Sequence, residues 1–279
     1  MSIQEQFKTF YKEHKPKTME DALEKFAIFG GVEWDKIDTS KPSFELIKEF
    51  ILNDYSYIRN DITDQTTGQP LYHSILTAIA MGDGKTNSIY KRAKVTQEVG
   101  EKAIETLIEY KILSRKKSKG ADDKFVFNTP FMRFWFAFVS PIFQGIRDGS
   151  YDEVQTRWEN HKTEFTNYIF TELSRSLIKK ALKDEILMGV KEFWQNSGIS
   201  LDIYAQTKEK KNIVGVCKYT KSKIKKSELS KLQELTKKAN IDAEIFIIVS
   251  KEGFSKELKG LKGENLKLFT LKNFKMLVE

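Results

Sequence analysis

The stretch at residues 199–219, ISLDIYAQTKEKKNIVGVCKY, decides the fold of the C-terminal part of the chain. It contains two runs rich in aliphatic and β-branched residues, at 199–205 and 212–219, separated by the Lys-rich turn 206–211. Two such runs joined by a short polar turn predict a β-hairpin.

The segments around this hairpin predict a sheet accompanied by helices. Residues 152–183 form a long amphipathic helical region, which we expect to break near residues 160–162. After the hairpin, a helical pattern at 229–238 precedes AEIFIIVS at 243–250, an apolar run typical of a buried strand. A further short strand is predicted at 266–270. Two hairpin strands followed by a helix and a strand indicate a mixed sheet, so the fold class is α/β (α+β mixed).

The central part of the chain has the pattern of a winged helix-turn-helix. Helical patterns at 71–81, 87–93 and 97–110 follow one another closely. Two short β-like runs, at 112–114 and 124–127, come after them, and the basic sequence RKKSKG lies between these runs as a wing would.

A winged helix can bind DNA through its third helix and its wing. The candidate contacts are polar and basic residues of these two elements: Thr96, Gln97, Lys102, Arg115, Lys116, Lys117 and Lys119. The alternative is a winged helix that packs against protein, because four Glu between residues 98 and 109 make the third helix acidic and oppose phosphate contact.

Three parts of the chain are predicted. Residues 1–62 are helical, with apolar residues spaced three and four apart at 19–29 and 44–52. The polar stretch DITDQTTGQP at 61–70 contains Gly and Pro and is the best candidate for a linker. The expected parts are a helical segment at 1–65, the winged helix at 66–145 and a nuclease-like α/β domain at 146–279.

The composition is that of a chain that folds without a membrane segment. Of its 279 residues, 40% are hydrophobic and 31% are charged, which argues against disordered, collagenous and low-complexity classes. No window approaches the ~18–20 apolar residues of a membrane helix, and the N-terminus lacks the apolar run of a signal peptide. The single cysteine, Cys217, excludes an internal disulfide and fits a reducing compartment. We expect a cytoplasmic protein.

The net charge of +8 is concentrated at the C-terminus. Residues 201–279 contain 18 Lys, no Arg and ten acidic residues, whereas the remaining 200 residues are neutral overall. This positive field favours nucleic acid as partner, with DNA expected ahead of RNA. The alternative is a solvated Lys-rich face that keeps the protein soluble. The candidate phosphate contacts are Lys208, Lys210, Lys211, Lys221, Lys223, Lys225 and Lys226.

The hairpin also carries residues that could perform chemistry. Asp202 lies in its first strand and Lys218 in its second, and alternation along the strand places Val216 on the same face as Lys218. This arrangement resembles the restriction-endonuclease-like PD-(D/E)xK nuclease core. In that superfamily, the hairpin Asp and an acid two residues before the Lys hold a divalent metal, and the Lys orients water or stabilises charge. Here the acid position is Val216, which cannot ligate a hard cation.

Glu172, on the helix before the hairpin, matches a further acid that such nucleases place near the metal. The resemblance therefore implies Glu172, Asp202 and Lys218 as catalytic residues, with Asp202 and Glu172 as ligands of Mg²⁺ or Mn²⁺. Glu185 or Glu192 would have to replace the missing ligand. In the alternative, cleavage is lost and Asp202 and Lys218 remain only as a pair.

The order of motifs extends the resemblance over nearly the whole chain. The motifs are FGGV at 29–32, the winged helix, the aromatic FWFAFVSP at 134–141, the helix with Glu172, and GVCKYT at 215–220. This order resembles the C-terminal part of a family of uncharacterised archaeal-type and bacterial AAA-like ATPases, with an ATPase module, a winged helix and a nuclease-like domain. The resemblance implies that residues 1–62 correspond to the helical lid of the ATPase module, which is otherwise missing, and the family's GECK-like segment reads GVCK here.

The most aromatic stretch of the chain is PFMRFWFAFVSPIF, at 130–143. Because the run is nearly continuous and contains a single charge, at Arg133, we expect it in the core. The alternative is a platform on which nucleic-acid bases stack.

Three functions follow as hypotheses. The first is a DNA-binding protein whose PD-(D/E)xK-like cleavage site is degenerate and whose affinity comes mainly from phosphate contacts. The second is an active nuclease that uses Mg²⁺ or Mn²⁺. The third is a regulatory module that binds a separately encoded ATPase or a second copy of itself.

Overall fold

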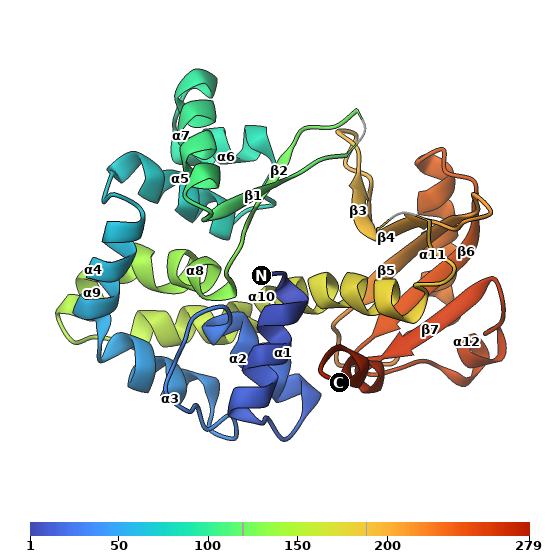
Figure 1. Ribbon diagram of the computed structural model, residues 1–279, viewed down its shortest axis with the longest axis horizontal. Helices are drawn as coiled ribbons and strands as arrows, with labels where there is room; N and C mark the ends of the chain where they lie inside the picture. The colour runs from blue at the N-terminus through green and yellow to red at the C-terminus, as the bar shows by residue number, and fades with distance from the viewer. Residues whose placement is uncertain (119, 188) are drawn as a thin grey trace. The chain divides into compact units, whose positions relative to one another are not determined.

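The computed structural model describes residues 1–118, 120–187 and 189–279. These residues divide into two compact units, drawn in Figure 1. Unit 1 comprises Met1–Lys117 and Asp122–Lys162, and unit 2 comprises Ser118–Ala121 and Thr163–Glu279. Among the described residues, no helix combines the length and the apolar character needed to span a membrane.

Unit 1 begins with helices that pack around aromatic and aliphatic side chains. These elements are α1 (Ile3–His14), α2 (Met19–Phe29), α3 (Ser43–Ile47), the π-helical turn η1 (Lys48–Leu52) and α4 (Tyr55–Gln65). Ser2 caps α1, because its hydroxyl accepts from the N–H of Glu5 while the Glu5 carboxylate accepts the Ser2 N–H. Phe7 of α1 and Phe26 of α2 are fully buried, with ring centroids 5.1 Å apart.

The structure corrects the predicted linker at 61–70, because the first half of it is helical. Helix α4 continues to Gln65, with Ile58 and Ile62 buried one turn apart on its inner side. The chain leaves the helix through Thr67 and Gly68, both with positive φ. Only residues 66–69 separate α4 from the next helix.

Three helices and a hairpin then follow in the predicted order. Helices α5 (Pro70–Ala80), α6 (Thr86–Ala93) and α7 (Gln97–Glu109) precede the antiparallel strands β1 (Leu113–Lys116) and β2 (Lys124–Phe127). Gly84, between α5 and α6, has a φ of +73°, and a Cβ there would lie 2.6 Å from the carbonyl oxygen of Phe125. Glycine permits this approach, and the Phe125 N–H donates to the Gly84 carbonyl at 2.8 Å.

Most of the aromatic run lies in the core, as the sequence predicts, whereas Pro141 and Phe143 are exposed. It forms α8 (Pro130–Phe134), the π-helical turn η2 (Trp135–Val139), the 3₁₀ turn η3 (Ser140–Ile142) and the first residue of α9 (Phe143–Arg147). Phe134 and Phe138 are 0% and 3% exposed, and both contact the ring of Trp158 edge-on. These rings are therefore not available for stacking on bases.

Helix α10 (Asp152–Ala181) is continuous over 30 residues, so the break expected near 160–162 is wrong. The helix contains no Gly or Pro, the residues that commonly interrupt helices. Asn160 and His161 are exposed, whereas Trp158 and Phe165 are buried. The polar residues mark the solvent side of an amphipathic helix.

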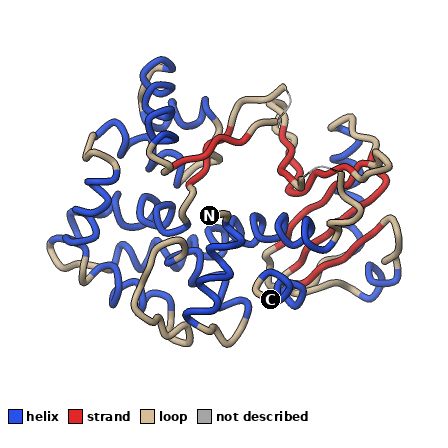
Figure 2. Tube along the Cα trace, viewed as in Figure 1, coloured by secondary structure: helices blue, strands red, loops and turns tan. Residues whose placement is uncertain are grey.

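The sheet of unit 2 is mixed, as predicted. Its strands are, in spatial order, β3 (Lys191–Trp194), β4 (Ser200–Gln206), β5 (Asn212–Lys218), β6 (Ala243–Ser250) and β7 (Leu266–Thr270), drawn in red in Figure 2. Strands β3, β4 and β5 pair antiparallel, whereas β5, β6 and β7 pair parallel. Helix α11 (Lys226–Lys238) connects β5 to β6, α12 (Lys256–Gly260) follows β6, and the 3₁₀ segment η4 (Leu271–Leu277) follows β7.

Helices lie against both faces of this sheet. On one face, Val216 of β5 packs with Leu232 of α11 in a cluster of buried residues. On the other face, Phe170 of α10 stacks on Phe274 of η4 at a centroid distance of 5.3 Å and lies 5.3 Å from the ring of Tyr219. Both faces of the central strands are therefore covered, which explains the continuous apolar sequence of β6.

Candidate functional site

Three elements of unit 2 carry the predicted catalytic residues. Glu172 lies on α10, Asp202 on β4 and Lys218 at the end of β5. Regular pairing between β4 and β5 begins at Ile203, so Asp202 lies just beyond the ladder. There, its Oδ2 accepts a hydrogen bond of 2.8 Å from the backbone N–H of Cys217. This bond holds the Asp202 carboxylate beside the strand that carries Lys218.

Arg175 links Glu172 to Asp202. It follows Glu172 by three residues on α10 and is 8% exposed. Its Nη2 donates to Glu172 Oε1 at 2.5 Å, and its Nη1 donates to the backbone carbonyl oxygen of Asp202 at 2.8 Å. Burial acts to lower the pKa of this guanidinium, but the surrounding groups that favour its charge, first Glu172 and then Glu192, together outweigh burial, so the pKa is raised. The centre of the predicted nuclease site therefore contains a buried, paired cation.

Asp202 is a half-buried acid with a raised pKa. Burial is the main cause, because the ionised carboxylate loses hydration there, and Glu192 adds a like charge. The N–H of Cys217 and the charges of Arg175 and Lys218 lower the pKa, but they do not cancel the effect of burial.

Lys218 pairs with Glu228 of α11. The Lys218 Nζ lies 2.6 Å from Glu228 Oε1, and the Glu228 side chain is 20% exposed. No ion pair joins Lys218 to Asp202 within the described ranges, so the predicted Asp202–Lys218 pair is wrong. Alternation along β5 explains the result, because it places Lys218 on the face covered by α11.

The residues around Asp202 do not fit a divalent metal. Val216 lies in the apolar cluster against α11 and offers no oxygen ligand. Glu172 has the oxygen chemistry, but its carboxylate accepts a hydrogen bond from Arg175, whose positive charge opposes a nearby metal ion. In the part of the chain that the structure describes, no three His, Cys, Asp or Glu side chains form a group that could hold a metal.

The two carboxylates considered as replacement ligands lie in different places. The backbone carbonyl of Glu185 accepts a hydrogen bond from the N–H of Lys208, which lies beyond the end of β4, whereas Asp202 lies near its start. The carboxylate of Glu185 pairs with Lys267 at 3.3 Å. Glu185 is therefore not part of the site. Glu192 lies on β3, the strand next to β4, and is close enough to Asp202 to raise the pKa of that residue.

We expect the substitution Asp202→Asn to stabilise the protein at neutral pH. A folded-state pKa above the unfolded value makes the contribution of Asp202 to stability most favourable below about pH 3.9, and this contribution is lost as pH rises through the folded pKa. Asparagine removes the half-buried charge and keeps an oxygen for the Cys217 N–H. In urea unfolding, the gain should be on the order of 1 kcal/mol at neutral pH and disappear near pH 4. The exposed Asp242→Asn is the control, and an equal gain at both pH values would contradict the prediction.

Four of the predicted phosphate contacts lie together at one edge of the sheet. The parallel strands β5 and β6 end at this edge, and the loops that follow them are joined by a bridge between Ile224 and Phe254. The lysines of the first loop and the start of α11, which we term the basic edge, are all exposed: Lys221, Lys223, Lys225 and Lys226. Open α/β sheets commonly bind ligands at the carboxyl ends of their strands.

The other three lysines lie at the opposite end of β5. Lys208, Lys210 and Lys211 belong to the turn between β4 and β5, and Lys211 Nζ lies 2.7 Å from Glu209 Oε2. Because β5 has seven residues, at ~3.3 Å each, about 20 Å separates this turn from the basic edge. The structure therefore does not bring the seven lysines into one surface.

In unit 1, side chains of the third helix are paired with acidic neighbours. Lys102 Nζ lies 2.9 Å from Glu98 Oε1, and Gln97 Nε2 donates to Glu101 Oε1 at 2.7 Å. Thr96 immediately precedes α7. These pairs neutralise part of the surface that would have to approach phosphate.

The wing carries the remaining predicted contacts of unit 1. Arg115 pairs with Glu105, lies 3.4 Å from an oxygen of Asp123, and has its guanidinium 5.5 Å from the ring centroid of Phe125. Lys116 ends β1, Lys117 follows it, and Lys119 lies outside the described residues.

Sequence reasoning missed Arg175 and Glu228. The spacing of Arg175 from Glu172, three residues along a helix, is a signal for an ion pair that could have been used. Glu228 has no such signal, because only the packing of α11 on the sheet brings it to Lys218.

The site lies in a segment with recognisable relatives. Residues 135–232 match a family model. It is DUF234, described as archaea bacterial proteins of unknown function, and it covers 98 of the 279 residues, including Glu172, Asp202 and Lys218. The match is consistent with the resemblance inferred from the order of motifs. No curated protein and no solved structure matches the chain.

Proposed function

We propose that this chain binds double-stranded DNA through its backbone phosphates, and that its nuclease-like sheet serves for binding without cleavage. The observation that carries the proposal is the basic edge, four exposed lysines that follow Lys218 where β5 ends. Lysines that approach phosphates release condensed counterions, which gives affinity with little sequence preference.

The order of elements supports the nuclease-like part of the proposal. A helix, three antiparallel strands, a second helix and a parallel strand follow one another from α10 to β6. Asp202 and Lys218 lie on neighbouring strands of this sheet, as the resemblance to PD-(D/E)xK nucleases implies. Val216 and the bond between Arg175 and Glu172 favour the loss of cleavage, because both reduce the oxygen ligands available to a metal.

Unit 1 has a supporting role in this proposal. The succession of α5, α6 and α7 before the hairpin of β1 and β2 supports a winged helix. We assign most of the affinity to the basic edge, because Lys102 and Arg115 are paired with glutamates. In the described part of the basic edge, Lys226 lies 3.4 Å from Glu257, whereas Lys221, Lys223 and Lys225 form no ion pair.

We expect neutralising the basic edge to weaken DNA binding by about 100-fold. The variant K221Q/K223Q/K225Q/K226Q should also lower the slope of log affinity against log salt by about 3 to 4, since each phosphate contact contributes ~0.9. The measurement is fluorescence anisotropy of a labelled duplex in EDTA over a series of KCl concentrations. The matched control K208Q/K210Q/K211Q removes a similar charge from the opposite end of β5 and should change affinity less than about threefold.

Three outcomes would overturn this proposal. Equal losses in both variants would indicate attraction by net charge alone. A wild-type protein that does not bind the duplex would favour a regulatory module with a protein partner. Cleavage in Mn²⁺ that is lost in Asp202→Ala would show that the site is an active nuclease.

A further inference from the structure

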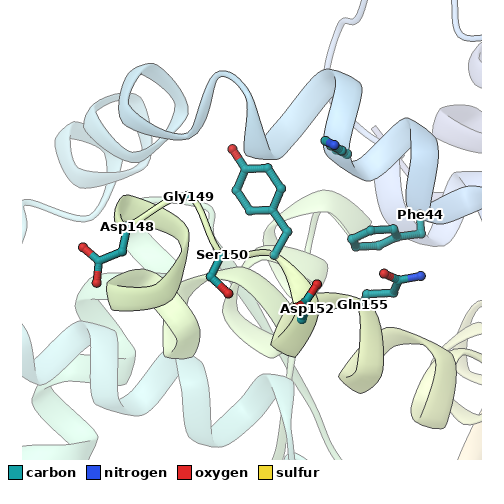
Figure 3. Close-up of a pocket in the computed structure, with 8 residues that line it drawn as sticks. Phe44, Asp148, Gly149, Ser150, Asp152 and Gln155 are labelled. Carbon is teal, nitrogen blue, oxygen red and sulfur yellow. The ribbon is translucent and has the colours of Figure 1, made fainter.

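Among the described residues of unit 1, two pockets have equal size and opposite charge, each of about 470 Å³. The first, drawn in Figure 3, surrounds the start of α10 and is lined by Asp148 and Asp152. Lys48 also lines this pocket, and its Nζ lies 5.9 Å from the ring centroid of Tyr151. Two carboxylates against one ammonium make this pocket unsuitable for an anion.

The second pocket, which we term the α5–α6 pocket, has a basic lining. His73 and Thr77 of α5, Arg92 of α6 and Lys94 just after it contribute to its wall. None of the described residues that line it is acidic. In the described part of the chain, neither Arg92 nor Lys94 forms an ion pair. Their charges are therefore available to a ligand.

Two further cations lie close to this pocket. Arg157 Nη2 lies 3.0 Å from the sulfur of Met81, which lines the pocket. Arg59 is near enough to His73 to lower the pKa of its imidazole, in addition to the larger effect of burial. Together these groups produce a positive potential in a concave surface, where an anion is favoured.

A buried hydroxyl group in the wall has no partner. Thr77 Oγ1 is inaccessible to solvent, and it makes no hydrogen bond to any described residue. Buried hydroxyls are normally satisfied, and rotation about the Cα–Cβ bond of Thr77 would bring this hydroxyl to a ligand oxygen in the pocket. Ala78, Ala93 and Pro141 form an apolar part of the wall, and the volume is typical of pockets that bind small molecules.

We propose that the α5–α6 pocket binds a small phosphate monoester. Arg92 and Lys94 pair with its phosphate, Thr77 supplies a hydrogen bond, and the apolar wall receives the esterified group. The proposal is independent of the DNA interface, because Arg92 and Lys94 belong to unit 1 and the basic edge belongs to unit 2.

The test is a titration followed by NMR of the histidine rings. The chain has three histidines, so the His73 signal can be assigned with the variant His73→Gln. The probes are inorganic phosphate and adenosine 5′-monophosphate, with adenosine and equal ionic strength of chloride as controls. We expect both phosphate probes, and neither control, to shift the His73 signal saturably. R92Q and K94Q should each weaken binding about tenfold. K91Q, in the same helix but not lining the pocket, should change it less than about twofold.

Two results would overturn the proposal. The first is a His73 signal that responds to chloride as strongly as to phosphate, or that responds to phosphate equally in K91Q and R92Q. Either response would show unspecific screening of charge. The second is a response to duplex DNA without any response to the two phosphate probes, because it would assign the pocket to a DNA backbone phosphate. Failure of the DNA interface itself would not produce either result, since the variants of the basic edge leave this pocket unchanged.

Discussion

The substitution Arg175→Met lowers the free energy of unfolding by about 3–5 kcal/mol, the range found when one partner of a buried ion pair is removed. Methionine fills a similar volume but cannot donate a hydrogen bond. The Glu172 carboxylate loses its cation, and the backbone carbonyl of Asp202 loses a donor. Denaturant unfolding at neutral pH measures the effect directly.

The matched control for this prediction is the double variant E172Q/R175M. It removes both charges of the pair, so we expect it to be more stable than Arg175→Met alone. The deficit of the single variant should also shrink towards pH 5, because a buried carboxylate without its cation favours the protonated form. A double variant as unstable as the single variant would show that packing, and not charge, determines the loss.

The substitution Phe170→Ala has a comparable expected effect, about 3–5 kcal/mol. Phe170 is fully buried on α10, with its ring stacked on Phe274 and tilted against Tyr219. Alanine leaves a cavity between α10 and the C-terminal segment η4. Urea unfolding gives the change in stability, and the exposed Phe143→Ala should cost less than about 1 kcal/mol as a control.

A smaller loss at Phe170 would contradict this assignment of the core of unit 2. A second variant, Phe274→Ala, tests the same contact from the other side. Because the two rings touch, the double variant should cost less than the sum of the single variants.

The fold could be predicted where the hydrophobic residues form one clear pattern, either an apolar run or a helical spacing. Strands β2, β6 and β7 begin and end where their apolar runs do, and α2 has the predicted bounds. Strand β3 escaped prediction because its sequence KEFW is short and begins with two charged residues, one of them in the group around Asp202. Its identity as a strand depends on pairing with β4, which no local pattern shows.

The errors had a common cause in the interpretation of polar residues. Asn160 and His161 were expected to interrupt a helix, but they lie on the exposed side of α10, where polar side chains are favourable. The polar residues among 61–65 likewise lie on the outer side of α4. The buried side of this helix continues to Ile62. Polarity alone does not end a helix when its buried stripe persists.

The sequence predicts Glu172, Asp202 and Lys218 as members of the candidate site, and this stays a prediction, but it does not predict the pairings that the structure shows. Glu172 and Asp202 lie on neighbouring elements of unit 2, as expected. Their partners could not be predicted, because Arg175 and Glu228 are ordinary charged residues of helices until tertiary packing brings them to the sheet. The burial that raises the pKa of Asp202 is likewise a property of the packed structure.

The continuity of α10 also limits how this protein can exchange modules in evolution. The boundary between the two units falls at residue 162, inside the helix, so a genetic cut there leaves 11 helical residues on one side and 19 on the other. Isolated helices shorter than ~12–15 residues are marginal in water, and both fragments would begin or end with unpaired backbone groups. The family match at 135–232 includes the whole of this helix. Selection is therefore expected to transmit the two units as a single inherited piece, and recombination that separates them should be rare among related genes.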